Sequence, residues 1–334
     1  MSGRDAVVNA MSVDVEDYYQ VSAFAGSVDR ATWNSFPSRV EDNTRRTLDL
    51  FAESSVRATF FTLGCVAERH KGLVRAIAEA GHEVASHGWE HYRVGDQDPA
   101  EFRADVTRTK KVLEDLSGQE VKGYRAASFS INRRTWWAFD ELAEAGYRYS
   151  SSIHPIRHDH YGVPDAPRFP FAPVELNRLT EIPVGTLDVG GLRMSCAGGG
   201  FFRLLPYQWS SFAIGKVNRA ERQPVTFYFH PWEIDPAQPR ISTAPLRSKL
   251  RHYTNLGVME AKLKRLLREF RWDRVDAVYG LSRTVTSAGP EAQSFIGPEP
   301  QSFIGPEAQS TGDVRRRSGL WPNVIHQRPE PHSQ

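Results

Sequence analysis

Three carboxylates crowd into one short segment near the start of the sequence. They are Asp14, Glu16 and Asp17, and they follow a run of residues typical of a β-strand. Like charges this close disfavour one another unless a cation offsets the repulsion, so the cluster favours a bound cation. Side chains alternate along an extended chain, which puts Asp14 and Glu16 on the same side. The alternative interpretation is an exposed acidic turn.

Two histidines, His87 and His91, form a His-x-x-x-His pair directly after a second short apolar run. Neutral imidazoles at this spacing can converge on one metal ion in a turn or at the start of a helix. Two histidines and one carboxylate would leave coordination positions open, which is typical of a catalytic metal rather than a structural one. The chain has only two cysteines, Cys65 and Cys196, which excludes a thiolate zinc finger and a disulfide framework.

Two further polar residues follow strand-like segments. Arg125 could form an ion pair with a carboxylate and keep it ionised, although a lone arginine is usually a surface residue. His230 follows an aromatic run and could be a buried structural histidine or a general acid. Taken together, a metal, a base, a cation that orients the base and an acid are what metal-assisted hydrolysis needs.

The elements that must position these residues alternate between strand and helix. Strands are expected at residues 7–15, 57–63, 82–86, 121–124, 147–150, 180–184 and 225–229. Helices are expected at residues 43–54, 73–80, 99–116 with Asp98 as N-cap, 133–145, 206–220 and 259–270. Repeated β–α units imply a parallel sheet, and this many units favour a (β/α) barrel of about seven parallel strands. In such a fold chemistry is located at the carboxyl ends of the strands.

The two ends of the chain differ in composition. Residues 1–286 are expected to form the barrel, and residues 287–334 a flexible low-complexity tail. An octapeptide repeats from Pro290 and again from Pro298, and its regular Pro and Gly would break both helix and strand. The alternative is a docking segment that uses the pairs Phe295/Ile296 and Phe303/Ile304.

The charge balance and hydropathy limit the partners. The 334 residues carry a net charge of +2, which gives no reason to expect a nucleic acid partner. No stretch approaches the roughly 20 apolar residues of a membrane helix, and residues 1–10 do not resemble a secretory signal. We therefore expect a protein that is not integral to the membrane and is cytoplasmic, with the inner face of the membrane as an alternative.

In their order, the four polar segments resemble the motifs of the polysaccharide deacetylases of the NodB-homology type, carbohydrate esterase family four. The resemblance covers roughly residues 8–280. The stretches 155–162, 197–203 and 251–257 resemble a subgroup associated with exosortase and exopolysaccharide gene clusters of Gram-negative bacteria. The sequence departs from the usual family motifs at Val15, which separates the acids, and at Gly88 and Ala127.

The resemblance implies a distorted barrel that binds a divalent metal, for which Zn2+ is our prediction. The ligands would be His87, His91 and an acid of the first motif, with Glu16 preferred by alternation and Asp17 second. The implied general base is Asp14, oriented by Arg125, and the implied general acid is His230. A final group of aromatic residues could line sugar subsites or belong to the core: Tyr18, Tyr19, Trp89 and Trp232.

The implied reaction is removal of N-acetyl groups from amino sugars of an exopolysaccharide or of its lipid-linked oligosaccharide precursor. The lack of a recognisable signal segment favours a precursor on the cytoplasmic side. Two alternatives remain open at this point. One is a metal-dependent amidase or deformylase of the same fold that acts on a small molecule, and the other is a glycan-binding barrel without catalytic activity.

Overall fold

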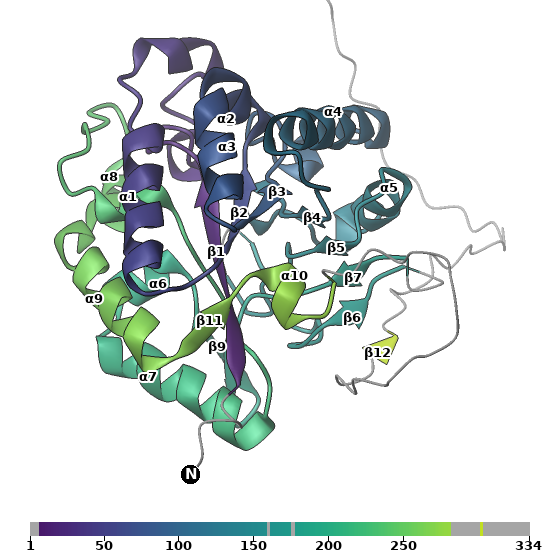
Figure 1. The fold of residues 1–334 in the computed structure, drawn as a ribbon, viewed down its shortest axis with the longest axis vertical. Helices are drawn as coiled ribbons and strands as arrows, with labels where there is room; N and C mark the ends of the chain where they lie inside the picture. Colours follow the sequence, from purple (N-terminus) through teal and green to yellow (C-terminus); the bar gives the residue numbers. More distant parts are fainter. Residues whose placement is uncertain (1–6, 159–160, 175–177, 282–300, 303–334) are drawn as a thin grey trace, which may run out of the picture.

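The fold is a curled, mostly parallel sheet surrounded by helices (Figure 1). The computed structural model describes residues 7–158, 161–174, 178–281 and 301–302. Seven parallel strands follow one another in the order β10-β1-β2-β3-β4-β5-β7. Their bounds are β1 Val8–Val15, β2 Thr59–Thr62, β3 Glu83–Ser86, β4 Gly123–Tyr124, β5 Tyr149–Ser150, β7 Thr180–Glu181 and β10 Thr226–Phe229.

A single hydrogen bond, rather than a regular ladder, joins the two ends of this series of strands. After β7 the chain continues to Gly185, whose N–H donates to the carbonyl of Thr226 in β10 at 3.0 Å. The sheet therefore curls back on itself with one weak seam. This arrangement confirms the distorted barrel of about seven parallel strands that the alternating pattern predicts.

The central strands are apolar because they are buried on both faces. Val13, Phe60, Val84 and Phe229 have no solvent-exposed surface and belong to one continuous core. Buried polar side chains also occur within and at the starts of these strands, for example Asn9, Thr59 and Glu83, and the residues singled out in the sequence lie at the carboxyl ends.

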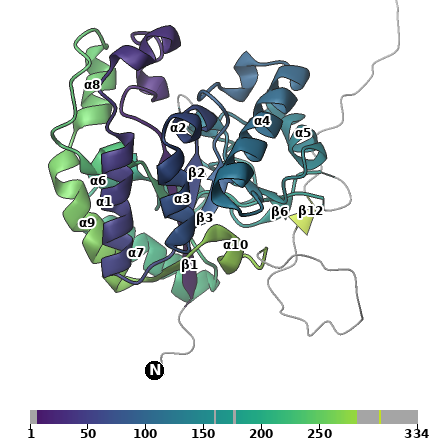
Figure 2. The same cartoon turned by 45° about the horizontal axis from the view of Figure 1, so that its top comes forward.

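Ten helices of the described residues pack around the sheet (Figures 1 and 2). Their bounds are α1 Val40–Glu53, α2 Gly64–Arg69, α3 Lys71–Glu79, α4 Pro99–Ser117, α5 Ala138–Glu144, α6 Gly199–Leu204, α7 Tyr207–Lys216, α8 Leu246–Tyr253, α9 Leu256–Glu269 and α10 Val275–Val278. Asp98 caps α4 in a capping box with Glu101, as predicted, and Gly118 ends the helix in a left-handed conformation. None of these helices has the length and apolar character needed to cross a membrane.

Some predicted elements have different bounds. The predicted helix 133–145 is split into a 3-10 turn, Arg133–Thr135, and α5. The predicted helix 206–220 ends as α7 at Lys216 and continues as a π turn over Val217–Glu221.

Five further strands were not predicted. They are β6 Phe171–Ala172, the hairpin of β8 Thr186–Val189 and β9 Leu192–Ser195, β11 Arg271–Asp273, and β12 Gln301–Ser302. The two residues of β12 pair with β6 and are all that the structure describes of the predicted tail 287–334. The remainder of that tail, with both Phe-Ile pairs, lies outside the described residues.

Candidate active site

The carboxyl ends of four strands bring the predicted residues together. Asp14 and Glu16 lie at the end of β1, His87 follows β3, and His230 follows β10. These residues and His91 line one cavity of about 280 Å³. Arg125, which follows β4, lies behind Asp14, so every segment singled out in the sequence contributes to the same place.

Glu16, His87 and His91 form a group suited to a metal ion. One ligand atom from each residue lies within 4.8 Å of the other two, and all three side chains are buried. Oε2 of Glu16 is buried and accepts no hydrogen bond, although Nε2 of His91 lies 2.9 Å away. Nδ1 of His87 donates to the carbonyl of Arg125 at 2.8 Å, which leaves Nε2 as the electron-pair donor.

The loop between the two histidines needs unusual backbone angles. Gly88 has φ +78° and His91 has φ 54°, and these left-handed residues turn the chain so that the two imidazole centroids come within 5.2 Å. Any side chain at Gly88 would add strain at that φ and approach Oδ1 of Asp105 at 3.2 Å. The positive φ therefore explains the glycine at position 88, where the sequence departs from the usual family motif.

The ionisation states of the group suit metal binding. Burial by itself would raise the pKa of Glu16, but the charges of His91 and His230 outweigh it and lower this pKa to about 2. Burial lowers the pKa of His87 to about 4. At neutral pH the carboxylate is therefore ionised and the His87 imidazole neutral, the forms that bind metals.

The second candidate ligand, Asp17, is not brought into this group. Its carboxylate accepts hydrogen bonds from Ser38 Oγ at 2.7 Å and from the backbone N–H groups of Arg39 at 2.9 Å and Val40 at 3.2 Å. Asp17 therefore holds the first turn of α1, where free N–H groups attract a negative charge. Burial raises the pKa of Asp17 despite these bonds.

Asp14 is held by a fully buried arginine. Nη1 of Arg125 lies 2.6 Å from Oδ1 of Asp14. The remaining donors of the guanidinium bind the hydroxyl of Ser12 and the hydroxyl and carbonyl of Ser151. This network fixes the Asp14 carboxylate in one orientation with its other oxygen towards the cavity.

His230 faces Asp14 and Glu16 across the cavity and is itself held from behind. Its Nε2 lies 3.9 Å from Oδ2 of Asp14 and 3.5 Å from Oε1 of Glu16. Its Nδ1 donates to Oε1 of Glu233 at 2.6 Å, and Nε of Arg203 lies 3.0 Å from Oε2 of Glu233. Burial alone would lower the pKa of His230, but the carboxylates of Glu16, Glu233 and Asp14 raise it to about 9.

Sequence reasoning did not identify Glu233 and Arg203. Glu233 lies three residues after His230 in the same 3-10 turn, a spacing that could have indicated an ion pair. Arg203 comes from the distant helix α6, and nothing in the sequence links it to His230. Gly199, also in α6, packs against the Glu233 carboxylate so closely that a Cβ atom there would overlap it.

The aromatic candidates divide into two groups. Trp232 lines the cavity and stacks between the rings of His230 and His252, and its Nε1 donates to Oε1 of Glu16 at 3.3 Å. Tyr18 and Tyr19 are buried in a cluster with other apolar side chains and do not line the cavity. Trp89 is also buried, with the guanidinium of Arg108 over its ring.

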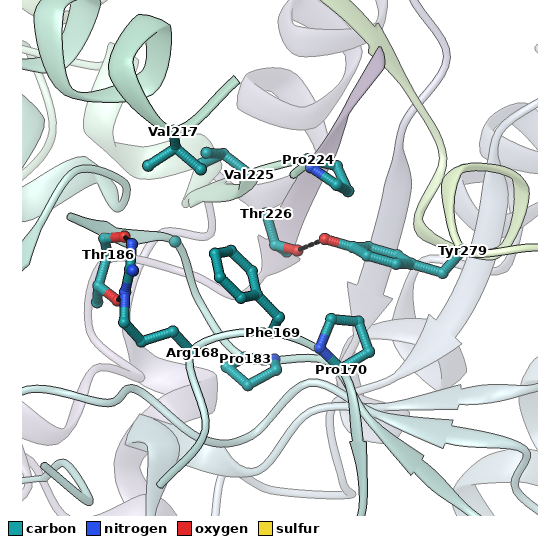
Figure 3. Close-up of a pocket in the computed structure, with 11 residues that line it drawn as sticks. Arg168, Phe169, Pro170, Pro183, Thr186, Val217, Pro224, Val225, Thr226 and Tyr279 are labelled. Atoms are coloured by element: carbon teal, nitrogen blue, oxygen red, sulfur yellow. Dashed lines mark hydrogen bonds between the residues drawn. The ribbon is translucent and has the colours of Figure 1, made fainter. Parts of the chain in front are cut away.

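A second cavity lies at the amino end of β10 (Figure 3). Arg168, Phe169 and Thr186 line one side of it, and Tyr279 donates to or accepts from Thr226 at 2.9 Å on the other. Its volume of about 10 Å³ is the space of one water molecule, so it cannot hold a substrate.

Two family models match adjacent parts of the chain. Residues 28–150 match the model described as polysaccharide deacetylase. Residues 151–280 match the model described as a domain of unknown function, DUF3473. Arg203, His230 and Glu233 therefore lie in the part without a described function, and Asp14 and Glu16 precede both matches.

Several curated relatives are deacetylases. Peptidoglycan-N-acetylglucosamine deacetylase PgdA of Listeria monocytogenes is 32% identical over 26% of this chain and 19% of its own length. The peptidoglycan-N-acetylglucosamine deacetylase of Bacillus cereus is 31% identical over 31% of this chain and 38% of its own length. The chitooligosaccharide deacetylase of a Bradyrhizobium species is 27% identical over 32% and 47%. The chain thus spans less than half the length of these relatives.

A solved structure supports the fold over a longer range. The crystal structure of a polysaccharide deacetylase candidate from Mycobacterium smegmatis superposes with a TM-score of 0.50 and covers 87% of this chain and 98% of that one. The two sequences are 21% identical, so this likeness concerns the fold alone. The family model and the curated relatives thus show that part of the chain, centred on residues 28–150, is similar to polysaccharide deacetylases.

Proposed function

We propose that the protein is a metal-dependent hydrolase that removes N-acetyl groups from amino sugars of a glycan. The observation that carries the proposal is the arrangement of Asp14 and His230, which face each other at 3.9 Å beside the group of Glu16, His87 and His91. Each is backed by its own buried arginine, directly for Asp14 and through Glu233 for His230. The curated relatives described above are named as deacetylases of peptidoglycan N-acetylglucosamine or of chitooligosaccharides, which supports this choice of reaction.

The residues present fit a divalent metal, for which we propose Zn2+. Two imidazoles and one carboxylate are a typical catalytic zinc donor set, and the buried Glu16 oxygen without a hydrogen bond would gain a partner. When bound, such a metal polarises the acetyl carbonyl and makes a bound water more acidic.

The protein's own groups move the protons. Asp14 accepts a proton from the attacking water, because Arg125 holds one carboxylate oxygen and leaves the other facing the cavity. Water oxygen first adds to the acetyl carbon, and the C–N bond breaks as the carbonyl re-forms, so the products are acetate and an amine. His230 donates its Nε2 proton to the leaving nitrogen, which could not depart as an amide anion. Glu233 holds the ring from the Nδ1 side throughout.

The glycan in our proposal belongs to an exopolysaccharide or to its lipid-linked precursor. The support is the resemblance of residues 155–162, 197–203 and 251–257 to the subgroup found with exopolysaccharide genes. The second of these stretches contains Gly199 and Arg203, which position Glu233, so the subgroup's own residues take part in the site.

The test combines metal analysis with product analysis. Purified protein and the variant His87→Ala are assayed for bound metal and for acetate released from an N-acetylglucosamine oligomer. We expect one divalent metal and acetate release in the parent protein, and loss of both in the variant. His70→Ala is the matched control, because His70 pairs with Glu41 at the surface away from the cavity. Formate released from an N-formyl amino sugar, with no acetate from the oligomer, would support a deformylase. Glycan binding without turnover would contradict the proposed activity.

A further inference from the structure

His252 is a histidine of the cavity wall that the proposed reaction does not use. Four histidines of the described residues line the active-site cavity. Of these, His87 and His91 belong to the group suited to a metal, and His230 faces Asp14. The fourth, His252, comes from α8 and is buried. Burial of a polar ring costs free energy unless its nitrogens are hydrogen-bonded, so the partners of this ring indicate its role.

The hydrogen bonds around His252 fix which of its nitrogens carries the hydrogen. Nε2 of His252 lies 2.7 Å from Oε1 of Gln238. The amide of Gln238 is oriented by its own N–H groups, which donate to the carbonyls of Trp232 at 2.7 Å and Asp235 at 2.9 Å. Its Oε1 can therefore only accept, so Nε2 of His252 is the donor and Nδ1 carries an electron pair.

Nδ1 of His252 is an open acceptor. Within the described residues it makes no hydrogen bond, and it is not among the polar atoms that are closed to solvent without a partner. Because the ring lines the cavity, the open space at Nδ1 is that of the cavity. His154 shows the opposite arrangement, since both of its nitrogens are closed to solvent and its ring does not line the cavity.

The ring of His252 is neutral and can therefore only accept at Nδ1. Burial, followed by the charge of Arg203, lowers the pKa of His252 to about 2. A neutral imidazole nitrogen with an electron pair binds an O–H or N–H donor, and it does not bind a carboxylate or phosphate oxygen. On a glycan such donors are chiefly hydroxyl groups.

The neighbours of His252 hold its ring in place. Trp232 stacks on it at 4.1 Å between centroids, and Phe24, from the segment that follows β1, packs against it at 4.6 Å. Figure 2 shows α8 beside this purple segment. The guanidinium of Arg203 also donates to the backbone carbonyl of His252 at 2.9 Å. A ligand that binds Nδ1 therefore meets an acceptor already in position, which reduces the entropy cost of binding.

Trp232 connects His252 to the reacting groups. The same indole stacks on His230 at 5.0 Å between centroids, and its Nε1 donates to Oε1 of Glu16 at 3.3 Å. One aromatic ring thus separates His252 from the imidazole that protonates the leaving nitrogen in the proposed reaction.

We propose that Nδ1 of His252 accepts a hydrogen bond from a hydroxyl group of the glycan whose acetamide lies at Asp14 and His230. The hydroxyl belongs to the sugar that carries the acetamide or to the sugar next to it. The inference rests on the proposed deacetylase function and adds a residue that selects the substrate. His252 is then a recognition residue that takes no part in proton transfer.

Substrates that lack single hydroxyl groups test this hydrogen bond in the parent protein. The series consists of an N-acetylglucosamine oligomer and its deoxy analogues, in each of which one hydroxyl of the acetylated sugar or of its neighbour is replaced by hydrogen. We expect kcat/KM for acetate release to fall about tenfold for one analogue, because Nδ1 then has no donor. Equal kcat/KM for every member of the series would overturn the inference.

Two variants locate the effect at His252. His252→Gln keeps an N–H donor for Gln238, and His252→Phe keeps a ring that can stack on Trp232, but neither keeps the Nδ1 acceptor. In both variants kcat/KM for the full oligomer should fall about tenfold, while kcat/KM for the sensitive deoxy analogue stays at the parent value. A fall by the same factor for both substrates would overturn the inference, because loss of packing alone has that effect.

His154→Phe is the matched control, because it removes a buried imidazole that does not line the cavity. The ratio of kcat/KM between the full oligomer and the sensitive analogue should stay as in the parent protein. If no member of the series releases acetate, the proposed function fails separately, and calorimetric binding of the same sugars decides the inference. Weaker binding of one analogue by the parent protein, with equal binding of both sugars by His252→Gln, would support it. Equal affinities in the parent protein would contradict it.

Discussion

Arg125 and Arg203 are the two largest side chains that are fully buried, and each holds a carboxylate on one side of the same cavity. Arg125 binds Asp14 directly, and its other donors end on Ser12 and Ser151. Arg203 binds Glu233, which in turn holds His230, and its other donors end on backbone carbonyls at the end of α8. Arg125 therefore orients Asp14 directly, whereas Arg203 positions His230 through Glu233 and also holds part of the cavity wall.

The largest effect on kcat is expected from Asp14, the proposed base, which Arg125 holds directly. Asp14→Asn keeps the shape of the side chain but removes the base, so kcat should fall by about a thousandfold. Acetate release and metal content are measured together. Retained metal with lost turnover would assign the base to Asp14, whereas a fall of less than tenfold would remove Asp14 from that role.

Replacing Glu233, which contacts His230 and lies behind it, should lower kcat less than replacing Asp14. In Glu233→Gln the His230 ring loses a charged partner but keeps a hydrogen-bond acceptor, so kcat should fall roughly 10- to 100-fold with little change in KM. The measurement is the pH profile of kcat, whose alkaline limb should move to lower pH because a raised pKa of His230 depends partly on Glu233. An unchanged profile would show that Glu233 is only structural.

The sequence could predict the Arg125 side of this comparison but not the Arg203 side. The candidate site residues in the first half of the chain come at the ends of apolar strands, so their convergence follows from the parallel sheet alone. Alternation along β1 also separates Glu16, which joins the histidines, from Asp17, which turns to α1. The contact between Arg203 and Glu233 depends instead on how α6 packs against the turn after β10, which no local pattern encodes.

The helices and strands also divide into those that the sequence could predict and those that it could not. Long, buried strands and capped helices such as α4 could be predicted, because periodicity and capping residues are local signals. The six-residue helices α2 and α6 and the eight-residue α8 are too short for a clear periodic signal.

In contrast to Asp14, replacing Asp17 should affect the stability of the protein and not its activity. Asp17→Asn weakens the bonds to the N–H groups that start α1, so the free energy of unfolding should fall by about 1–2 kcal/mol. Chemical denaturation measures the change, and metal content and kcat of the folded protein should be unaffected. Loss of metal from the folded variant would mean that Asp17 is a ligand after all.

The smallest expected effect is on the pH dependence of stability, through His252, which lies next to Arg203. Burial, followed by the charge of Arg203, lowers the pKa of His252 to about 2. Below about pH 6.5 the unfolded chain binds a proton there and the folded chain does not, so stability falls as the pH falls. Each such group contributes at most about 1.4 kcal/mol per pH unit. In His252→Gln the free energy of unfolding should therefore change less between pH 7 and pH 5 than in the parent protein. Chemical denaturation at the two pH values measures this change. The same change in both proteins would contradict the lowered pKa of His252.

The place of β1 in the sheet delays the completion of its pairing during synthesis. Strand β1 is the first of the described strands to leave the ribosome, and β10, which covers one of its edges, is the last of the seven parallel barrel strands to follow. Until then β1 presents unpaired backbone groups, a template for pairing with other chains. His230 follows β10 directly, so the same late event that covers this edge of β1 also brings His230 to Asp14 and Glu16.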